Sequence, residues 1–429
     1  MLIDSLIIKK NNAGITLFDL TNGASYQFNN TGKTIIECLQ DGHTEDHIVS
    51  KLRNDYVHIP LGQISEDVAI FIRKLNHFGL LRTTDVNVSK IDALCWDITY
   101  KCNLSCTHCY LGDIINNHDV NENLLLTVWE QLKDKQIGII DFSGGEPFLH
   151  KHFLSLLELT ALNNNGVMIK TNATLIDNTT AQLLSQLDNV LVVSISLDGP
   201  SPEIHDAMRS PGAFQRTVKG IENLAKYGVY TNLVFTSTDF NYPYIENTIN
   251  LGIRLGANSF QVSTVFSQGR AITNSIELSH NTRKFHFINL DNITKNLKGE
   301  IGIASFSDRY DLFVEGKFKR KGCGLTKGNF MIDPSGNIFP CRRFSGMDAH
   351  KIGNILGIDF DWEETIHKIK SFSSLTVDNL PKCSLCKIKY LCGGLCRQNA
   401  VVHTGDFLGQ DPDCHSFRRA CETFISWKT

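Results

Sequence analysis

Three cysteines stand close together in the run Cys102-Asn-Leu-Ser-Cys106-Thr-His-Cys109, directly after the apolar, strand-like stretch Ala93–Thr99. An iron–sulfur cube needs four ligands, and proteins usually supply four thiolates. Three thiolates leave one iron with an open position, where a small molecule can bind. The C-x3-C-x2-C spacing therefore predicts a catalytic iron–sulfur site. The alternative is a zinc site, which takes four ligands and could use His108 as the fourth.

A second motif, Ser143-Gly144-Gly145-Glu146-Pro147, follows the next strand-like stretch, Ile137–Phe142. Glycine lets a backbone approach a ligand closely because it carries no side chain. A carboxylate that faces an ammonium group forms a short, charge-assisted hydrogen bond. A zinc module needs no such motif, so the two motifs in this order favour the iron–sulfur site.

Together the two motifs resemble those of the radical S-adenosylmethionine (radical SAM) superfamily. In that family the open iron of a 4Fe–4S cluster chelates the amino and carboxylate groups of the methionine part of SAM. The resemblance implies that Gly144 and Gly145 let the backbone approach the methionine and that Glu146 accepts a hydrogen bond from its ammonium group. It also implies that the cluster ligands are Cys102, Cys106 and Cys109. Tyr110, at the end of their loop, would be an aromatic neighbour of SAM.

The same resemblance implies further SAM contacts near the run Ser196-Leu-Asp198-Gly199. Ser196 and Arg209 would hold the SAM carboxylate, because an arginine fork can bond both carboxylate oxygens. The alternative is that Arg209 is an ordinary surface residue. Asp198 could bond a ribose hydroxyl or only cap the turn. The run Thr171–Thr174 is a candidate for shaping the pocket.

The elements that position these residues alternate between strands and helices, which predicts a parallel sheet covered on its faces. This α/β pattern resembles the partial (β/α)6 TIM-like barrel of radical SAM enzymes, with its active site at the carboxyl ends of the strands. The expected strands are Ala93–Thr99, Ile137–Phe142, Val167–Thr171, Val190–Leu197, Thr231–Thr236 and Ser259–Ser263. The expected helices include Glu122–Lys133, Phe153–Leu162, Asn178–Leu187 and Phe214–Tyr227, and Ile288–Leu297 is a further candidate.

Residues 1–85 predict a separate small domain with three strands and three helices. They resemble the PqqD-like peptide-recognition domain, a winged-helix-like unit in which a leader peptide adds a strand to an exposed sheet edge beside the third helix. A DNA-binding winged helix is the alternative, but the segment is not notably basic. The expected strands are Leu6–Lys9, Ile15–Leu20 and Ser25–Asn29, and the expected helices are Thr31–Cys38, Glu45–Tyr56 and Glu66–Leu81.

The C-terminal third is rich in cysteine, and seven of these residues have spacings that resemble the SPASM extension of radical SAM peptide maturases. SPASM extensions carry two auxiliary 4Fe–4S clusters. The resemblance implies that Cys323, Cys341 and Cys396 hold the first, whose fourth ligand could be a side chain, water or substrate. It implies that the second is held by Cys383, Cys386, Cys392 and Cys414. A zinc knuckle between residues 383 and 396 is the alternative.

Three cysteines fall outside these spacings. Cys38 and Cys95 lie in apolar stretches and are expected to be small buried hydrophobic residues. Cys421 is a possible extra ligand of the first auxiliary cluster, although its spacing does not match.

The chain has 429 residues, which is enough for two or three domains, and a formal net charge of −3. That charge does not favour nucleic acid or an acidic membrane as a partner. No apolar stretch approaches the length of a membrane span, and no signal peptide is recognisable, so we expect a cytoplasmic protein. Thirteen cysteines in a reducing compartment indicate metal binding or catalysis. The expected domains are residues 1–85, a barrel at 86–265, a connecting segment at 266–322 and a SPASM domain at 323–429.

This domain order resembles enzymes that modify ribosomally made peptides. The resemblance implies that a 5′-deoxyadenosyl radical, formed by one-electron cleavage of SAM, takes a hydrogen atom from a peptide held by its leader. A crosslink then forms, either a thioether, which is slightly favoured, or a carbon–carbon bond. The auxiliary clusters would accept electrons, and a flavodoxin or ferredoxin would supply the first one. The alternatives are a formylglycine-type sulfatase maturase and a non-catalytic peptide-binding or redox-sensing protein.

Overall fold

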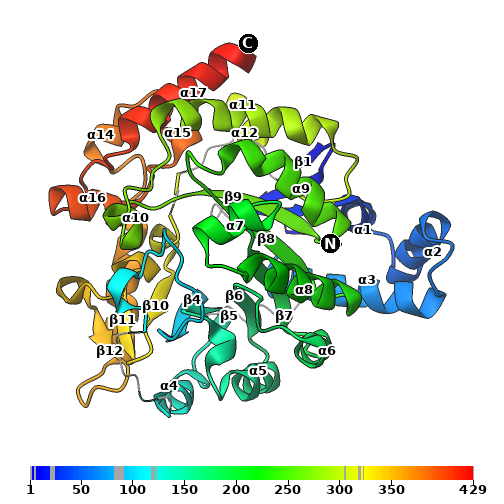
Figure 1. The fold of residues 1–429 in the computed structure, drawn as a ribbon, viewed down its shortest axis with the longest axis horizontal. Helices are drawn as coiled ribbons and strands as arrows, with labels where there is room; N and C mark the ends of the chain where they lie inside the picture. Colours follow the sequence, from blue (N-terminus) through cyan, green and yellow to red (C-terminus); the bar gives the residue numbers. More distant parts are fainter. Residues whose placement is uncertain are drawn as a thin grey trace.

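Six parallel strands form the centre of the fold in this computed structural model, and helices cover their outer face (Figure 1). The strands follow one another in the sheet in the order of the chain, which confirms the α/β fold and the partial barrel expected from the sequence. They are β4 (Ile91–Thr99), β5 (Ile137–Gly144), β6 (Gly166–Thr171), β7 (Val190–Ser196), β8 (Thr231–Ser237) and β9 (Ser259–Thr264). The structure describes residues 2–3, 6–19, 25–81, 91–116, 121, 123–303, 306–316, 320–321 and 323–428.

Side chains along each barrel strand alternate between the main hydrophobic core and the inner face of the barrel, because successive side chains of a strand point to opposite faces. On β4, Leu94, Trp96 and Ile98 are buried in the main hydrophobic core. Cys95 and Asp97 alternate with them and point to the inner face of the barrel. The covering helices are α4 (Leu124–Leu132), α5 (Phe153–Leu162), α6 (Asn178–Gln186), α7 (Pro202–Met208), α8 (Ala213–Lys226) and α9 (Ile245–Arg254).

Three short strands from the cysteine-rich region extend the barrel sheet beyond β4. Strand β10 (Phe330–Ile332) pairs in parallel with β4, and β11 (Asn337–Phe339) and β12 (Gly353–Asn354) follow in antiparallel order. The sheet therefore has nine strands in the order β12-β11-β10-β4-β5-β6-β7-β8-β9. Strands of two or three residues are too short to leave a periodic pattern, and the sequence did not predict them.

The N-terminal unit has the expected three strands and three helices. Its third helix begins five residues earlier than expected, directly after Pro60, and ends before Gly79, whose φ of +69° favours glycine. The expected domain boundary at residue 85 lies outside the described residues. The elements are β1 (Leu6–Asn11), β2 (Gly14–Asp19), β3 (Ser25–Phe28), α1 (Asn30–Gln40), α2 (Glu45–Asp55) and α3 (Leu61–His77).

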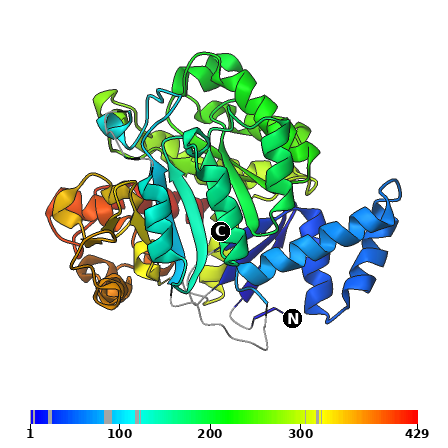
Figure 2. The same ribbon diagram turned by 90° about the horizontal axis from the view of Figure 1, so that it is seen from below.

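This unit packs against the amino ends of the barrel strands (Figure 2). The Tyr230 hydroxyl, just before β8, donates to the carbonyl oxygen of Gln27 at 3.1 Å. Arg73 on α3 pairs with Asp188, just before β7, at 3.1 Å. The unit therefore lies at the opposite end of the strands from the cysteine loop that follows β4.

The remaining helices belong to the C-terminal half. Helix α11 packs along α17 in Figure 1, and the helix expected at Ile288–Leu297 is the second half of α11. None of the described helices combines the length and apolar character needed to cross a bilayer. The helices are α10 (Arg270–Thr273), α11 (His280–Asn296), α12 (Phe306–Val314), α13 (Trp362–Ser371), α14 (Pro381–Ser384), α15 (Lys389–Cys392), α16 (Arg397–Thr404) and α17 (Cys414–Lys428).

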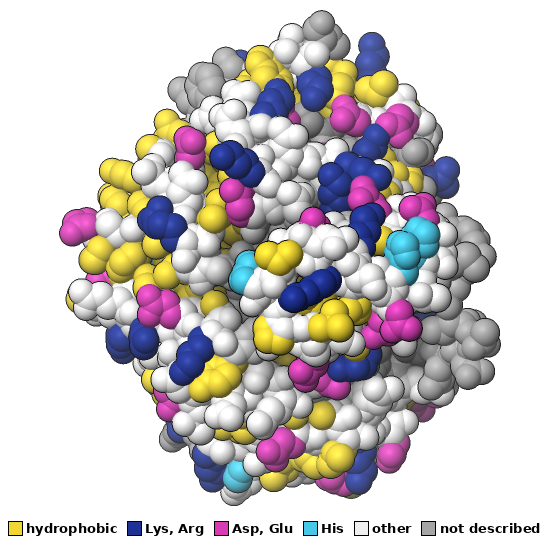
Figure 3. All heavy atoms as spheres, turned by 90° about the vertical axis from the view of Figure 1, so that its right-hand side faces the viewer, with side chains coloured by type: hydrophobic (Ala, Val, Ile, Leu, Met, Phe, Trp, Pro, Cys, Tyr) yellow, Lys and Arg dark blue, Asp and Glu magenta, His cyan; other side chains and the backbone are white. Residues whose placement is uncertain are grey.

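Acidic and basic side chains are interspersed on the face of the molecule shown in Figure 3. No large field of one sign stands out there, which agrees with the formal net charge of −3. This pattern gives no support to nucleic-acid binding by that face.

Close packing of α8 on the barrel leads to a stability prediction. A Cβ atom at Gly220 would lie 2.2 Å from the carbonyl oxygen of Ala173. Gly220→Ala should therefore lower the free energy of unfolding by about 1–3 kcal/mol. Gly62→Ala, on α3 with open space around it, is the matched control and should raise that free energy by about 0.4–1 kcal/mol. Denaturant unfolding measures both, and equal effects would contradict the packing argument.

Candidate active site and auxiliary metal sites

The cysteine loop begins where β4 ends, at the carboxyl end of the barrel. Burial raises the pKa of the Cys102 thiol to about 12, and the nearby Cys106, Glu146 and Cys109 act in the same direction. The structure thus brings the three cysteines together. Burial also raises the pKa of the Cys109 thiol. Metal ligation requires thiolates, so the binding of a cluster would release these protons.

A segment after β9 clamps this loop. The backbone N–H of Arg270 donates to the carbonyl oxygen of Cys109 at 2.9 Å, and the Asn274 side-chain amide donates to that of Thr107 at 2.8 Å. Gly269 has a φ of +56°, and a Cβ atom there would lie 2.4 Å from the Cys109 carbonyl oxygen. No motif in the sequence predicted this contact, and the glycine that follows the last strand was its only signal.

The two glycines of the second motif pack against the start of the cysteine loop. A Cβ atom at Gly144, whose φ is +116°, would lie 2.2 Å from the Thr99 carbonyl oxygen. A Cβ atom at Gly145 would lie 2.1 Å from that of Lys101. Both positions therefore require glycine for contact with the protein's own backbone. Their approach to a bound methionine stays a prediction.

Glu146 is fully buried between the ends of β5 and β6. Its carboxylate accepts hydrogen bonds from the Thr171 hydroxyl at 2.7 Å and from the backbone N–H of Asn172 at 2.8 Å. Burial nevertheless raises the pKa of Glu146 to about 7. A nearby cation, such as the ammonium group that is predicted to bind here, would favour the ionised carboxylate. The ammonium contact itself stays a prediction.

The run that follows β6 joins the cysteine loop. The Asn172 side-chain amide donates to Asn103 Oδ1 at 2.9 Å, and Asn103 donates to the Thr174 hydroxyl at 2.8 Å. This run thus lies beside the loop, as its predicted role in shaping the pocket requires.

Asp198 and Arg209 form a buried ion pair beside the loop. Arg209 Nε donates to Asp198 Oδ2 at 2.5 Å, and Arg209 Nη1 lies 3.7 Å from the Cys106 sulfur. Burial acts to raise the pKa of Asp198, but Arg209 and His108 outweigh it and lower that pKa. Arg209 is therefore not a surface residue. Ser196 lies half-buried at the end of β7, in the same neighbourhood.

Two other side chains of the loop have defined surroundings. Burial lowers the pKa of His108 to about 4, so its ring is neutral, and its Nε2 lies 3.7 Å from Asp198 Oδ2. The Tyr110 hydroxyl donates to Asp97 Oδ2 at 3.3 Å on the inner face of the barrel. Contact of Tyr110 with SAM stays a prediction.

The first auxiliary set also comes together. Burial, with the neighbouring Cys323, Cys396 and Cys95, raises the pKa of the Cys341 thiol. Cys95, expected to be only a buried hydrophobic residue, packs in the same apolar cluster as Cys323 and Cys341, which includes Met331. A fourth thiol from barrel strand β4 therefore lies near the first auxiliary set.

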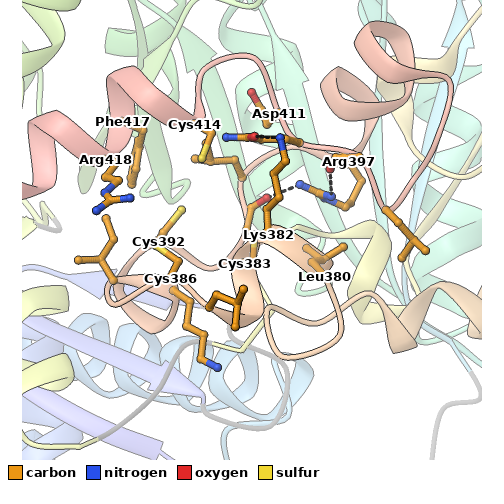
Figure 4. Close-up of a pocket in the computed structure, with 18 residues that line it drawn as sticks. Leu380, Lys382, Cys383, Cys386, Cys392, Arg397, Asp411, Cys414, Phe417 and Arg418 are labelled. Atoms are coloured by element: carbon orange, nitrogen blue, oxygen red, sulfur yellow. Dashed lines mark hydrogen bonds between the residues drawn. The ribbon is translucent and has the colours of Figure 1, made fainter.

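The second auxiliary set lines one cavity of about 330 Å³, shown in Figure 4. Its sulfur atoms come from α14, α15, α17 and the turn between the first two: Cys383, Cys386, Cys392 and Cys414. Cys421, considered above as an extra ligand of the first set, is fully buried and lies instead near Cys392 and Cys386 of the second set. Cys414 and Cys421 are about two turns apart on α17, so they lie on the same side of that helix. This relation could be recognised only once the helix was known.

No three described His, Cys, Asp or Glu side chains converge on a point where one metal ion would sit. The thiolates of a 4Fe–4S cube bind different irons, so convergence on a single point is not what such a site requires. The loop set and both auxiliary sets bring several thiols together, and thiolates are the donors that iron–sulfur clusters use.

Residues 96–251 match the family described as the radical SAM superfamily, and residues 14–81 match the family described as coenzyme PQQ synthesis protein D (PqqD). The chain is a radical SAM enzyme with a PqqD domain. Members of this superfamily use SAM and a 4Fe–4S cluster, as the resemblance of the motifs implied.

Known relatives of this radical SAM enzyme differ in what they make. The mycofactocin maturase MftC of Mycobacterium ulcerans is 28% identical over 330 residues, which cover 75% of this chain and 87% of that protein. An AdoMet-dependent heme synthase of Oleidesulfovibrio alaskensis is 25% identical over 348 residues, covering 75% and 86%. SuiB from Streptococcus suis bound to SAM shares the fold, with a TM-score of 0.59 at 18% identity over 96% of this chain and 99% of that one. SuiB has also been solved with its precursor peptide SuiA.

The buried Glu146 makes the stability of this radical SAM enzyme depend on pH. Its pKa of about 7 exceeds the ordinary value of 4.5, so the folded chain holds a proton that the unfolded chain has released between these values. The resulting stabilisation is complete below about pH 4.5 and is lost as the pH rises through about 7, a change of about 3 kcal/mol. Glu146→Gln should remove that loss.

Thermal unfolding of the SAM-free protein between about pH 5 and pH 8 measures this difference. Glu246→Gln, on the exposed side of α9, is the matched control and should follow the wild type. Parallel pH profiles for the wild type and Glu146→Gln would contradict the assigned pKa.

Proposed function

We propose that this radical SAM enzyme is a peptide maturase. It binds the leader of a ribosomally made precursor and installs an intramolecular crosslink in the attached core peptide. The observation that carries this proposal is the PqqD domain at residues 14–81, which is packed against a radical SAM barrel in one chain. The likeness to MftC, a maturase, and to SuiB, which has been solved with a precursor peptide, supports it.

The SAM site of the proposal lies at the carboxyl ends of the barrel strands. Cys102, Cys106 and Cys109 would hold the SAM-binding cluster. When bound, that cluster and SAM supply the radical chemistry that removes a hydrogen atom from an unactivated carbon. The chain would hold SAM through Arg209, Ser196 and the Glu146 carboxylate, with the remaining contacts from Tyr110, Gly144, Gly145 and Asp198.

Charge in the site favours this arrangement. Arg209 uses Nε for Asp198, which leaves further guanidinium donors for the SAM carboxylate. Glu146 is the buried carboxyl group that an ammonium would ionise. Glu146 and Arg209 would thus each face a group of opposite charge on the bound SAM.

The cysteine-rich region would hold two auxiliary clusters. The first takes Cys323, Cys341 and Cys396, and the second takes the four cysteines that line the 330 Å³ cavity. Forming a crosslink removes two electrons from the peptide, and these clusters are the proposed acceptors. A flavodoxin or ferredoxin is the proposed donor for the SAM-binding cluster.

The leader is proposed to bind along β3. Tyr26 and Phe28 of this strand pack at an angle against Phe78 and Phe71 of the α3 region, with ring centroids 5.1 and 5.2 Å apart. Strand β3 is at the edge of its sheet, where no other described strand pairs with it, although its Gln27 carbonyl oxygen accepts from the Tyr230 hydroxyl of the barrel. An unpaired edge is a template for an added strand. Because the unit lies at the amino ends of the barrel strands, the bound peptide has to pass along the barrel to reach the site.

Detection of a crosslink in the precursor peptide tests the proposal. The reconstituted enzyme is incubated without oxygen with SAM, a reductant and the full precursor peptide, and the peptide is then sequenced by tandem mass spectrometry. We expect loss of two hydrogens per crosslink and blocked fragmentation between the joined residues. A cysteine sulfur at one end identifies a thioether, which the proposal slightly favours over a carbon–carbon bond.

The same core peptide without its leader is the control, and it should be converted much more slowly. Formation of an aldehyde from a single cysteine or serine would instead identify a formylglycine-type maturase. SAM cleavage with an unchanged precursor would contradict the crosslinking proposal for that peptide.

A further inference from the structure

Two consecutive arginines follow Cys341 and have contrasting surroundings. Arg342 reaches into the barrel, where its Nε donates to Asp97 at 2.8 Å and its Nη1 lies 3.4 Å from Asp141. Arg343 turns the other way and is 8% exposed. Among the described residues, no carboxylate forms an ion pair with Arg343.

The contacts of Arg343 instead surround a cysteine of the first auxiliary set. Its Nη1 donates to the Cys396 sulfur at 2.9 Å, and its Nε donates to Gln268 Oε1 at 3.3 Å. Its guanidinium carbon lies 4.3 Å from the centre of the Phe266 ring. Its Nη2 is buried and has no hydrogen-bond partner among the described residues.

This arrangement is costly unless an anion is present. A buried cation requires a compensating charge, and a buried donor without an acceptor costs about 1–3 kcal/mol. The neutral partners Gln268 and Phe266 provide no negative charge. A cluster held by the thiolates of Cys323, Cys341 and Cys396 would provide both the negative charge and further sulfur acceptors.

We propose that Arg343 is the counter-cation of the first auxiliary cluster and raises its reduction potential. Nη1 donates to the Cys396 thiolate, and Nη2 donates to a second sulfur of the cluster. Positive charge and hydrogen bonds to sulfur favour the form that carries an additional electron. The inference rests on the auxiliary cluster of the proposed function. The cluster gains one electron, supplied by the peptide in turnover and by dithionite in the test below.

Gln268 is the positioning residue in this proposal. It accepts from Arg343 Nε and donates through its own Nε2 to the Arg343 carbonyl oxygen at 3.0 Å. The next two residues, Gly269 and Arg270, contact the backbone of the SAM-cluster loop. The guanidinium is therefore held by the same segment that clamps Cys109.

A redox titration of the full-length, reconstituted protein, followed by electron paramagnetic resonance, tests the proposal. Cys341→Ala identifies which signal belongs to the first auxiliary cluster. In Arg343→Gln we expect the reduction equilibrium of that cluster to become at least tenfold less favourable, which is a fall of 59 mV for one electron. Arg343→Lys keeps the charge and should restore part of the potential. Exposed Arg216→Gln is the matched control and should leave all potentials unchanged.

The outcomes separate this inference from the proposed function. An unchanged potential in Arg343→Gln, with iron content and signal retained, would overturn the role of Arg343 and leave the auxiliary cluster intact. If Cys341→Ala removed no signal and no iron, both the cluster assignment and this inference would fall. If Arg343→Gln did not assemble the cluster, a potential that falls by less than 59 mV in Arg343→Lys would support the charge as the cause, and a fall of 59 mV or more would overturn it.

Discussion

The buried ion network around Arg342 is the interaction on which the arrangement of the sites depends. Its guanidinium, which follows Cys341, bonds Asp97 on β4 and Asp141 on β5, and Lys170 on β6 also pairs with Asp141. Asp97 is fully buried. Removing one partner of a buried pair costs about 3–5 kcal/mol, because the other charge is left uncompensated. The network therefore fixes the cysteine-rich region against the inner face of the barrel.

Strand β4 connects the two kinds of site as a result. Its carboxyl end leads directly into the cysteine loop, and Tyr110 of that loop returns to Asp97. Its edge pairs with β10, which joins the cysteine-rich region to the barrel sheet. Its inner face carries Cys95, which lies near Cys341. One rigid strand thus sets the relative position of the SAM-binding loop and the first auxiliary set, as electron transfer between clusters would require.

The sequence predicted the parts that leave local patterns. All six barrel strands were expected within two residues of each observed end, because buried parallel strands form short, apolar runs. The cysteine motifs were visible because their spacing is local. The clamp at Gly269, the placement of Cys421 and the contacts of Arg343 could not be predicted, because each depends on residues that are distant in the sequence. The short strands β10 to β12 depend in the same way on the neighbouring edge of β4.

The central claim is that a radical formed at the carboxyl ends of this barrel acts on a peptide held by the N-terminal unit. The most direct measurement uses precursor peptide deuterated at the residues to be joined and follows the label by mass spectrometry. The account predicts deuterium in 5′-deoxyadenosine and loss of the same deuterium from the crosslinked peptide. 5′-Deoxyadenosine that carries no deuterium, formed while the peptide is crosslinked at the labelled residues, would contradict it.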